Sequence, residues 1–177
     1  MKKTNENLAT INNLYHSVNR KDIKFGVLLD NNLLNVRCHR PFILGNPIYV
    51  TDPTKRHEAC VVYDVYISHV YKHGVKKPIP PDLLNTPELS QIPAKDKYLL
   101  YMQIVNYCKN LYDKRKDEFI ISKTLDKLKS IYDKGINVNL WCYCAPKECH
   151  TLSLQCFIIN GYFLQQLKHD LEQNYEL

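Results

Sequence analysis

The spacing of apolar and polar positions divides the first forty residues into one helical and two extended segments. Apolar residues recur at helical spacing between residues 5 and 18, which predicts a helical N-terminal extension within residues 1–20. Two short apolar runs then follow at residues 23–29 and 33–38, separated by a turn tripeptide. This pattern is typical of a β-hairpin or of two successive strands.

The middle of the chain alternates between helical patterns and a segment rich in proline. Asp52 and Pro53 form a helix-start signal, and the apolar period that follows continues to a glycine at position 74. Residues 75–93 hold five prolines and no lasting period, so we expect an extended surface excursion. Residues 94–118 form the longest helical pattern. We therefore interpret residues 75–118 as an insertion that consists of the Pro-rich excursion and a long helix.

The last third of the chain predicts a helix, a strand and a final helix. A helical pattern over residues 122–134 ends near a glycine, and residues 136–144 alternate and are rich in β-forming side chains. Cys149 or His150 then opens the last helix. Helices interleaved with strands indicate one α/β domain over residues 1–177, with a three-layer Rossmann-like arrangement, a small and mostly parallel sheet, and the helical insertion.

Composition and charge exclude several classes of protein. No run of about 18 apolar residues exists, so no membrane span is expected, and the basic N-terminus lacks the apolar region of a signal peptide. Seven cysteines is an odd number, which favours reduced thiols and a cytoplasmic location, in the host cytoplasm if a phage encodes the chain. The net charge of +6 allows attraction to nucleotides, nucleic acid or an acidic protein, but no basic block concentrates it.

Four potential metal ligands lie within nine residues, where the predicted strand meets the last helix. They are Cys142, Cys144, Cys149 and His150. Cys142 and Cys144 are two positions apart in an extended segment and so face the same side. In parallel α/β sheets, ligands bind beyond the carboxyl ends of the strands, where helix N-termini point. This position makes the stretch the candidate functional centre.

Three interpretations of this cluster remain open at the level of sequence. In the first interpretation, Cys149 is a reactive thiolate at a helix N-terminus, and His150 is its base or orienting group in a catalytic pair. Alternatively, the four side chains bind zinc, although the spacing differs from separated pairs of Cys-x-x-Cys. In the third interpretation, the cysteines are small apolar residues at the end of a strand, and His150 caps the helix or contacts a ligand.

A second group of polar residues lies between the second extended run and the helix that follows it. Arg37 and His39 follow the run, and Arg56 lies in the first turn of the helix. Cations in a first turn oppose the helix dipole, so their presence is explained if they face a phosphate or carboxylate. A solvated helix end is the alternative. The group also contains Arg40, Asn46, Lys55 and His57.

Two stretches of the chain resemble one family. The run Leu140-Trp-Cys-Tyr-Cys-Ala-Pro-Lys-Glu-Cys-His150 looks like the C-terminal motif of domain-of-unknown-function family 4326, common in phage and bacterial genomes, in which a strand carries Cys-Trp-Cys-Ala-Pro and Cys-His closes the motif at a helix start. The segment Leu44-Gly-Asn-Pro-Ile48, followed by Arg56 and Tyr63, is similar to that family's Gly-Asn-Pro-Phe loop, Arg-Glu pair and helical tyrosine. The resemblance covers roughly residues 33–74 and 125–165.

The chain departs from the family's pattern in three places. Tyr143 stands where the family has tryptophan, Ile48 replaces phenylalanine, and residues 75–118 form an insertion. The resemblance implies a compact α/β domain in which the two motifs meet at one pocket. It assigns no reaction.

These observations lead to three functional hypotheses. The first is a phage-type enzyme or binding protein of nucleotide or nucleic-acid metabolism, in which a nucleotide-like or other anionic ligand occupies a pocket. Its ligand-binding residues would be Arg37, His39, Asn46 and Arg56, and its catalytic residues Cys149 and His150. The second is a non-catalytic interaction protein that binds a host protein or inhibits a defence system. The third is a small domain with zinc as its cofactor, bound by the four-residue cluster.

Overall fold

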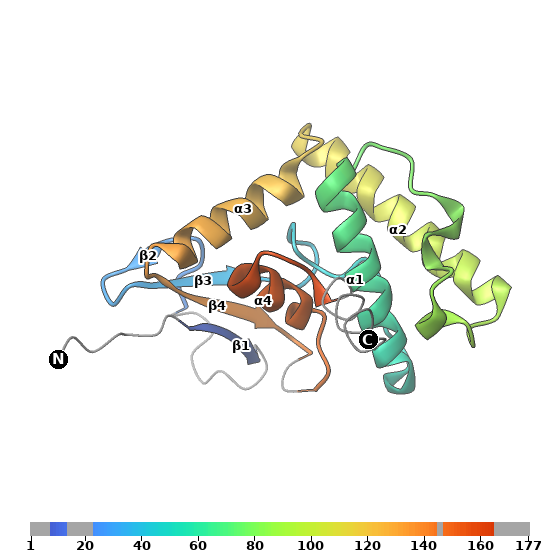
Figure 1. The fold of residues 1–177 in the computed structure, drawn as a ribbon, viewed down its shortest axis with the longest axis horizontal. Coiled ribbons are helices and arrows are strands. Elements are labelled where there is room, and N and C mark those ends of the chain that lie inside the picture. Colours follow the sequence, from blue (N-terminus) through green and yellow to red (C-terminus); the bar gives the residue numbers. More distant parts are fainter. Residues whose placement is uncertain (1–7, 14–22, 145–146, 165–177) are drawn as a thin grey trace, which may run out of the picture.

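The computed structural model describes residues 8–13, 23–144 and 147–164. Over these residues the chain forms a mixed α/β domain with one four-stranded sheet and four α-helices (Figure 1). The sheet is small and mostly parallel. The predicted Rossmann-like α/β class is therefore confirmed.

The sheet is built around the last strand of the described chain. Its strands are β1 (Ala9–Asn13), β2 (Leu28–Leu29), β3 (Leu33–Arg37) and β4 (Asn137–Cys142), in the order β1-β4-β3-β2. β4 pairs in parallel with both β1 and β3, while β2 and β3 pair antiparallel, which is the hairpin alternative of the two that the sequence allowed. The carboxyl ends of the three parallel strands thus meet at one edge of the sheet, and β4 ends between its two neighbours.

The N-terminal segment corrects one expectation. Ala9–Asn13 is a strand, so the prediction of a helix is wrong for these residues. They pair with β4 from Ala9 opposite Val138 to Asn13 opposite Cys142, and the Thr10 hydroxyl contacts the side chain of Asn139. The strand exists because a distant segment supplies its hydrogen-bond partners, which a local apolar period cannot reveal. The remainder of the predicted helix lies outside the described residues.

The helices are arranged around the carboxyl end and one face of the sheet. They are α1 (Arg56–His73), α2 (Ala94–Arg115), α3 (Ile120–Asp133) and α4 (Thr151–Asn160). In Figure 1, α4 lies across the strands and α1 stands near their carboxyl ends, while α2 lies outside α1. None of the helices in the described part of the chain is both long and apolar enough to cross a membrane.

Local signals explain both ends of α1. The Asp52 side chain accepts a hydrogen bond from the Thr54 backbone N–H and caps a short 3₁₀ turn that leads into α1. Gly74 ends the helix with a φ of 81°, a value that glycine adopts without strain. Between these ends, Tyr63 and Tyr66 are fully buried in the core. The helix-start and helix-stop signals of the sequence are therefore confirmed.

The Pro-rich segment is more deeply packed than we expected. Residues 75–93 contain two 3₁₀ turns, Pro81–Leu84 and Pro87–Leu89, both of which contact α1. The apolar side chains between the prolines are buried, namely Val75, Ile79, Leu84, Leu89 and Ile92. The expectation of an extended surface excursion is wrong because these apolar residues cover the outer side of α1.

Candidate metal centre and adjoining cavity

Two loops at the carboxyl edge of the sheet build the candidate site. The first follows β3 and leads into α1, and the second follows β4 and leads into α4. Cys142 ends β4, and His150 is the residue immediately before α4. The site therefore lies where parallel α/β sheets bind their ligands.

The structure brings the four potential metal ligands of the second loop together. One ligand atom from each of Cys142, Cys144, Cys149 and His150 lies within 4.8 Å of the other three. Cys142, Cys149 and His150 are buried, and Cys144 is half-buried. Four soft or borderline donors that converge from one strand end and one helix start can hold a metal ion.

The orientation of His150 explains how its ring presents a lone pair to this cluster. Its Nε2–H donates a hydrogen bond of 2.6 Å to the carbonyl oxygen of Cys38, so Nδ1 is the nitrogen that faces the cluster. Nδ1 lies 3.8 Å from the sulfur of Cys142 and 3.8 Å from that of Cys149. The ring also packs edge-on against Tyr63 at 4.6 Å between centroids. A carbonyl partner on the second ring nitrogen is what fixes metal-binding histidines in other proteins.

The sulfurs of the cluster also receive hydrogen bonds. The backbone N–H of Cys144 donates to the sulfur of Cys142 at 3.5 Å, and the Thr151 hydroxyl donates to the sulfur of Cys149 at 3.0 Å. Donors of this kind stabilise negative charge on sulfur. Thr151 is fully buried at the start of α4, so its hydroxyl donates to Cys149 and does not contact solvent.

The protonation of the cluster is shared among its members. Hydrogen bonds from Cys142 and Cys144 lower the pKa of Cys149 well below its ordinary value. The hydrogen bonds that Cys142 makes with Cys144 and Cys149 raise the pKa of Cys142. Burial alone would lower the pKa of His150, but hydrogen bonds and negative charge from Cys144 and Cys149 outweigh it and raise that pKa to about 9. The cluster thus gathers negative charge and attracts a positive one, which is a proton on His150 or a cation in its place.

The donor set and the spacing fit zinc. In tetrahedral zinc sites with sulfur and imidazole ligands, bond lengths of about 2.0 to 2.3 Å place the ligand atoms roughly 3.5 to 3.8 Å apart. The distances of 3.8 Å from Nδ1 to two sulfurs meet this requirement. The widest separation of 4.8 Å requires a contraction of about 1 Å. Three thiolates and one imidazole fill four positions, so such a site is closed to substrate.

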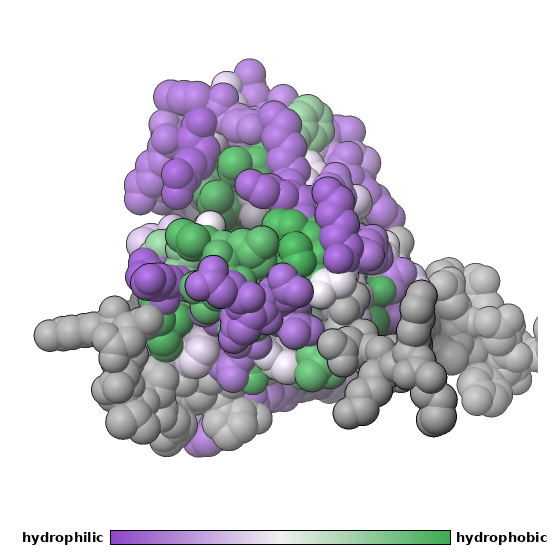
Figure 2. Space-filling model, turned by 90° about the vertical axis from the view of Figure 1, so that its left-hand side faces the viewer, coloured by the Kyte–Doolittle hydropathy of each residue, from purple (hydrophilic) through white to green (hydrophobic). Residues whose placement is uncertain are grey.

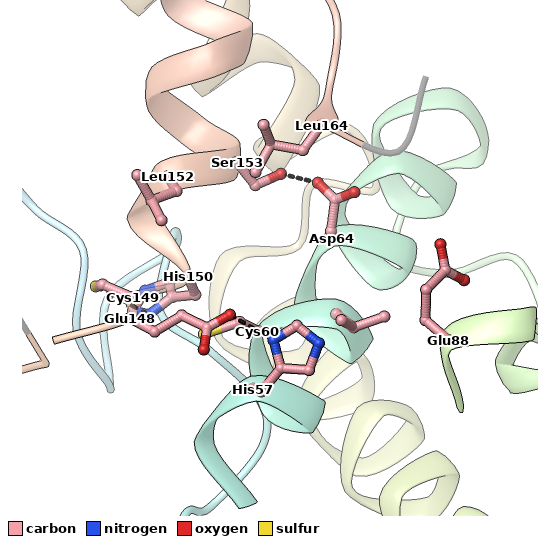
Figure 3. Close-up of a pocket in the computed structure, with 11 residues that line it drawn as sticks. His57, Cys60, Asp64, Glu88, Glu148, Cys149, His150, Leu152, Ser153 and Leu164 are labelled. Carbon is pink, nitrogen blue, oxygen red and sulfur yellow. Dashed lines mark hydrogen bonds and ion pairs between the residues drawn. The ribbon is translucent and has the colours of Figure 1, made fainter. Parts of the chain in front are cut away.

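Two side-chain contacts join α1 to the second loop and α4 beside the cluster (Figure 3). His57 in the first turn of α1 pairs with Glu148 at 2.7 Å, one residue before Cys149. Further along α1, the buried Asp64 accepts a hydrogen bond from the Ser153 hydroxyl in the first turn of α4. A small cavity of about 80 Å³ lies between these contacts. Its lining residues include the four that make the contacts and also Cys149. The contacts link α1 to the second loop and to the first turn of α4.

A larger cavity of about 450 Å³ also adjoins the cluster and shares Cys60, Glu148 and His150 with the small cavity. The two loops and the start of α1 form its walls, and its lining includes Cys142, Cys144 and His150. Two arginines line it, Arg40 and Arg56, and the acid among its lining residues is Glu148, which is already paired with His57. The two sequence motifs therefore meet at one pocket, as the family resemblance implied.

Aromatic rings lie against the side chains of Arg40 and His39 in this cavity. The Arg40 guanidinium lies 4.1 Å from the ring centre of Tyr49, and the His39 ring lies 4.6 Å from that of Tyr143. Partial burial lowers the pKa of His39, and its Nδ1–H donates to the carbonyl oxygen of Arg40 at 2.7 Å. Tyr49 and Tyr143 are both exposed, so their rings border the opening.

The structure separates the four residues that the sequence assigned to ligand binding. His39, Asn46 and Arg56 line the cavity, whereas Arg37 lines a different groove, between the rings of Phe25 and Phe42. The expectation that Arg37 joins the pocket is therefore corrected. β3 and β4 pair Arg37 with Trp141 and not with Cys142, so Arg37 is on the opposite face of the sheet from the cluster.

Asn46 has a local role in the loop. Its side chain accepts a hydrogen bond from the Ile48 backbone N–H at 2.8 Å and donates one to the Ala59 carbonyl at 3.2 Å. These bonds attach the loop to α1. They also use one donor and one acceptor position of the side-chain amide, so fewer hydrogen-bonding positions remain for a ligand.

Sequence reasoning missed the residues that support the cluster. The Cys38 carbonyl is a backbone atom and leaves no sequence signal. Asp64 does leave one, because it is a lone acid on the apolar face of α1 beside Tyr63, and a buried carboxylate requires a partner such as Ser153. Thr151 was recognisable only by its place directly after Cys149 and His150.

Comparison with known proteins identifies the family of the chain. The model of the family described as "Domain of unknown function (DUF4326)" matches residues 29–160. This range is well over half of the chain and includes both loops of the site, so the chain belongs to this family. Comparison with curated proteins gave no match, and neither did comparison with solved structures.

Proposed function

We propose that this member of the DUF4326 family is a zinc-binding protein whose metal is held by Cys142, Cys144, Cys149 and His150. The observation that carries the proposal is the convergence of four ligand atoms within 4.8 Å. The bond from His150 to the Cys38 carbonyl supports it, because it leaves Nδ1 as the nitrogen available to a metal. Bound zinc would supply a fixed cross-link between β4 and α4.

The same geometry disfavours Cys149 as a free nucleophile. Its side chain is 2% exposed, and its sulfur is occupied by the Thr151 hydroxyl and the neighbouring cluster atoms. A catalytic thiolate has to reach its substrate. We therefore assign Cys149 and His150 to the metal and not to covalent chemistry.

Metal content tests this assignment directly. Protein purified without chelator is expected to contain about one equivalent of zinc by elemental analysis, as for a single four-ligand site. Cys142→Ser should lose most of this zinc, whereas Cys108→Ser should retain it. Cys108 is the matched control because it is buried in α2, outside the cluster. Zinc below about a tenth of an equivalent in the wild-type protein would exclude the site.

A second function is favoured by the cavity of about 450 Å³ beside the cluster. We propose that it binds a nucleotide-like anionic ligand. Arg40 and Arg56 supply positive charge for a phosphate, and the rings of Tyr49 and Tyr143 supply surfaces on which a base can stack. In this arrangement the metal centre forms part of the cavity wall and keeps the two loops in place.

Ligand titration against two neighbouring cations tests the cavity. Nucleoside mono-, di- and triphosphates and ADP-ribose are titrated into the zinc-loaded protein by calorimetry. Arg56→Gln should weaken binding by about tenfold or more, since a charged hydrogen bond contributes about 1.5 to 3 kcal/mol. Lys55→Gln is the matched control, because Lys55 precedes Arg56 but does not line the cavity. No binding at millimolar ligand, or equal losses in both variants, would refute this function while leaving the zinc proposal intact.

A further inference from the structure

A second open hollow lies outside the metal centre and its cavity. This groove has a volume of about 570 Å³ and runs between α3 and the segments around β3. Phe25, Val36, Phe42 and Ile43 form apolar surface on the side of β3, and Leu128 and Ile131 form it on the side of α3. It shares no lining residue with the cavity beside the cluster. The groove is therefore a separate feature, and zinc is not part of it.

The charged residues of the groove all have the same sign. Arg37, Arg115, Lys123 and Lys127 line it, and its lining residues include no aspartate or glutamate. Lys123 is paired with Asp117 at 2.8 Å, which leaves three cations to face the groove. Arg37 is held between two aromatic rings, 4.3 Å from the centre of Phe25 and 4.9 Å from that of Phe42. A positive rim above an apolar floor selects a partner with the reverse charge.

The α3 side of the groove has a regular repeat. Lys123 and Lys127 are one turn apart, and Ile131 follows one turn later, so they form a stripe along the helix. Figure 2 looks onto the end of the molecule that carries β2, and it shows hydrophobic surface in a hollow below a hydrophilic ridge. Val27 and Leu28, which are exposed beside the lining residues Phe25 and Gly26, extend the apolar surface at this end. Apolar surface of this kind, bordered by polar residues, marks interaction sites.

We propose that this groove binds an acidic amphipathic helix of a partner protein. The apolar face of such a helix would pack on Phe25, Val36 and Ile131, and its acidic flanks would face Arg37, Arg115 and Lys127. Helices that insert into grooves use apolar residues at positions i, i+3, i+4 and i+7. Nucleic acid fits less well, because phosphates would have to lie over an apolar floor. This proposal rests on the groove alone and is independent of both functions proposed above.

A designed peptide provides the test. A fluorescein-labelled amphipathic peptide, with leucines at i, i+3, i+4 and i+7 and glutamates on both flanks, is titrated with the full chain as purified while fluorescence anisotropy is measured. We expect saturable binding that Lys127→Glu weakens about tenfold, because like charges across an interface are unfavourable. Lys109→Glu is the matched control, since Lys109 is an exposed lysine of α2 outside the groove. This variant should bind the peptide as tightly as the wild type does. Circular dichroism of both variants establishes that they are folded.

Five results would overturn the proposal. The first is the absence of saturable binding by the acidic peptide, and the second is equal binding by the same peptide with lysine flanks. The third is an equal loss of affinity in Lys127→Glu and Lys109→Glu. The fourth is displacement of the peptide by a single-stranded oligonucleotide, which would assign the groove to nucleic acid. The fifth is self-association of the chain that Lys127→Glu abolishes, which would assign the groove to a second copy.

Discussion

Replacing one cluster cysteine and one cysteine outside the cluster should separate metal binding from core packing. Cys149 and Cys156 are both buried, 2% and 8% exposed. Cys149 lies in the loop just before α4, and Cys156 lies within α4. In either position serine introduces a hydroxyl into a buried site, which costs about 1 to 3 kcal/mol. Only Cys149 belongs to the cluster. The difference between the two variants therefore measures the metal.

The size of that difference follows from binding linkage. When free zinc is buffered at about 100 times its dissociation constant, binding to the folded state adds roughly 2.7 kcal/mol to the free energy of unfolding. For a domain of this length, 1 kcal/mol shifts the melting temperature by about 2 to 4 °C. Zinc should therefore raise the melting temperature of the wild type and of Cys156→Ser by roughly 5 to 10 °C. Cys149→Ser should gain little.

Calorimetry or far-ultraviolet circular dichroism, in zinc buffer and in chelator, measures these shifts. We expect Cys149→Ser to melt below Cys156→Ser in zinc buffer, and the gap between the two variants to narrow in chelator. The reasoning is refuted if chelator leaves the wild-type melting temperature unchanged. It is also refuted if zinc raises the melting temperature of both variants equally, because the cluster would then not be the source of the stabilisation.

Three further changes test the loop between β3 and α1. Gly45→Ala should destabilise the protein by about 2 kcal/mol or more in thermal unfolding, because the added Cβ would lie 2.8 Å from the backbone nitrogen of Arg40. Asn46→Ala removes both hydrogen bonds of that side chain to the loop and α1 backbone, and should cost about 1 to 3 kcal/mol in urea unfolding. Tyr63→Phe removes the buried hydroxyl that donates to the Leu44 carbonyl at 2.9 Å, and should cost about 1 to 2 kcal/mol by the same measurement.

Two exposed residues serve as controls for these changes. Tyr98 is 61% exposed on α2, so Tyr98→Phe should leave the free energy of unfolding unchanged. Asn106→Ala, at another exposed position of α2, should likewise have little effect. If either control loses as much stability as its counterpart in the loop, the named hydrogen bonds are not the cause. An unchanged melting temperature in Gly45→Ala would contradict the prediction, because it would show that the loop backbone moves enough to accommodate the added methyl group.

The parts of the fold that local chemistry determines could be predicted from the sequence. Asp52 caps the 3₁₀ turn that leads into α1, and Gly74 ends α1. Aspartate and glycine are common at these two positions, so both ends could be recognised from the sequence. β4 was recognisable because residues 136–144 alternate and are rich in β-forming side chains, and the structure buries Val138, Leu140 and Cys142. The cluster could be recognised because its four potential metal ligands are close in sequence.

The parts that depend on long-range pairing could not be predicted. Whether Arg37 points to the cluster depends on the register between β3 and β4, and a shift of one residue would reverse the face of its side chain. The same limit applies to Ala9–Asn13, whose partners in β4 are well over one hundred residues away. The Cys38 carbonyl that orients His150 is 112 positions from it, and backbone atoms carry no residue-specific signal.

The central place of β4 has a consequence for how the chain matures. The strand that joins β1 to β3 is also the last strand in the described sequence, so the sheet remains divided until the ribosome has released residue 142. Until then β1 and β3 expose unpaired edges, which are templates for aggregation. The cluster begins with Cys142 at the end of β4 and is completed by His150, eight positions later. The proposed zinc could therefore bind all four side chains only after β4 is available to close the sheet.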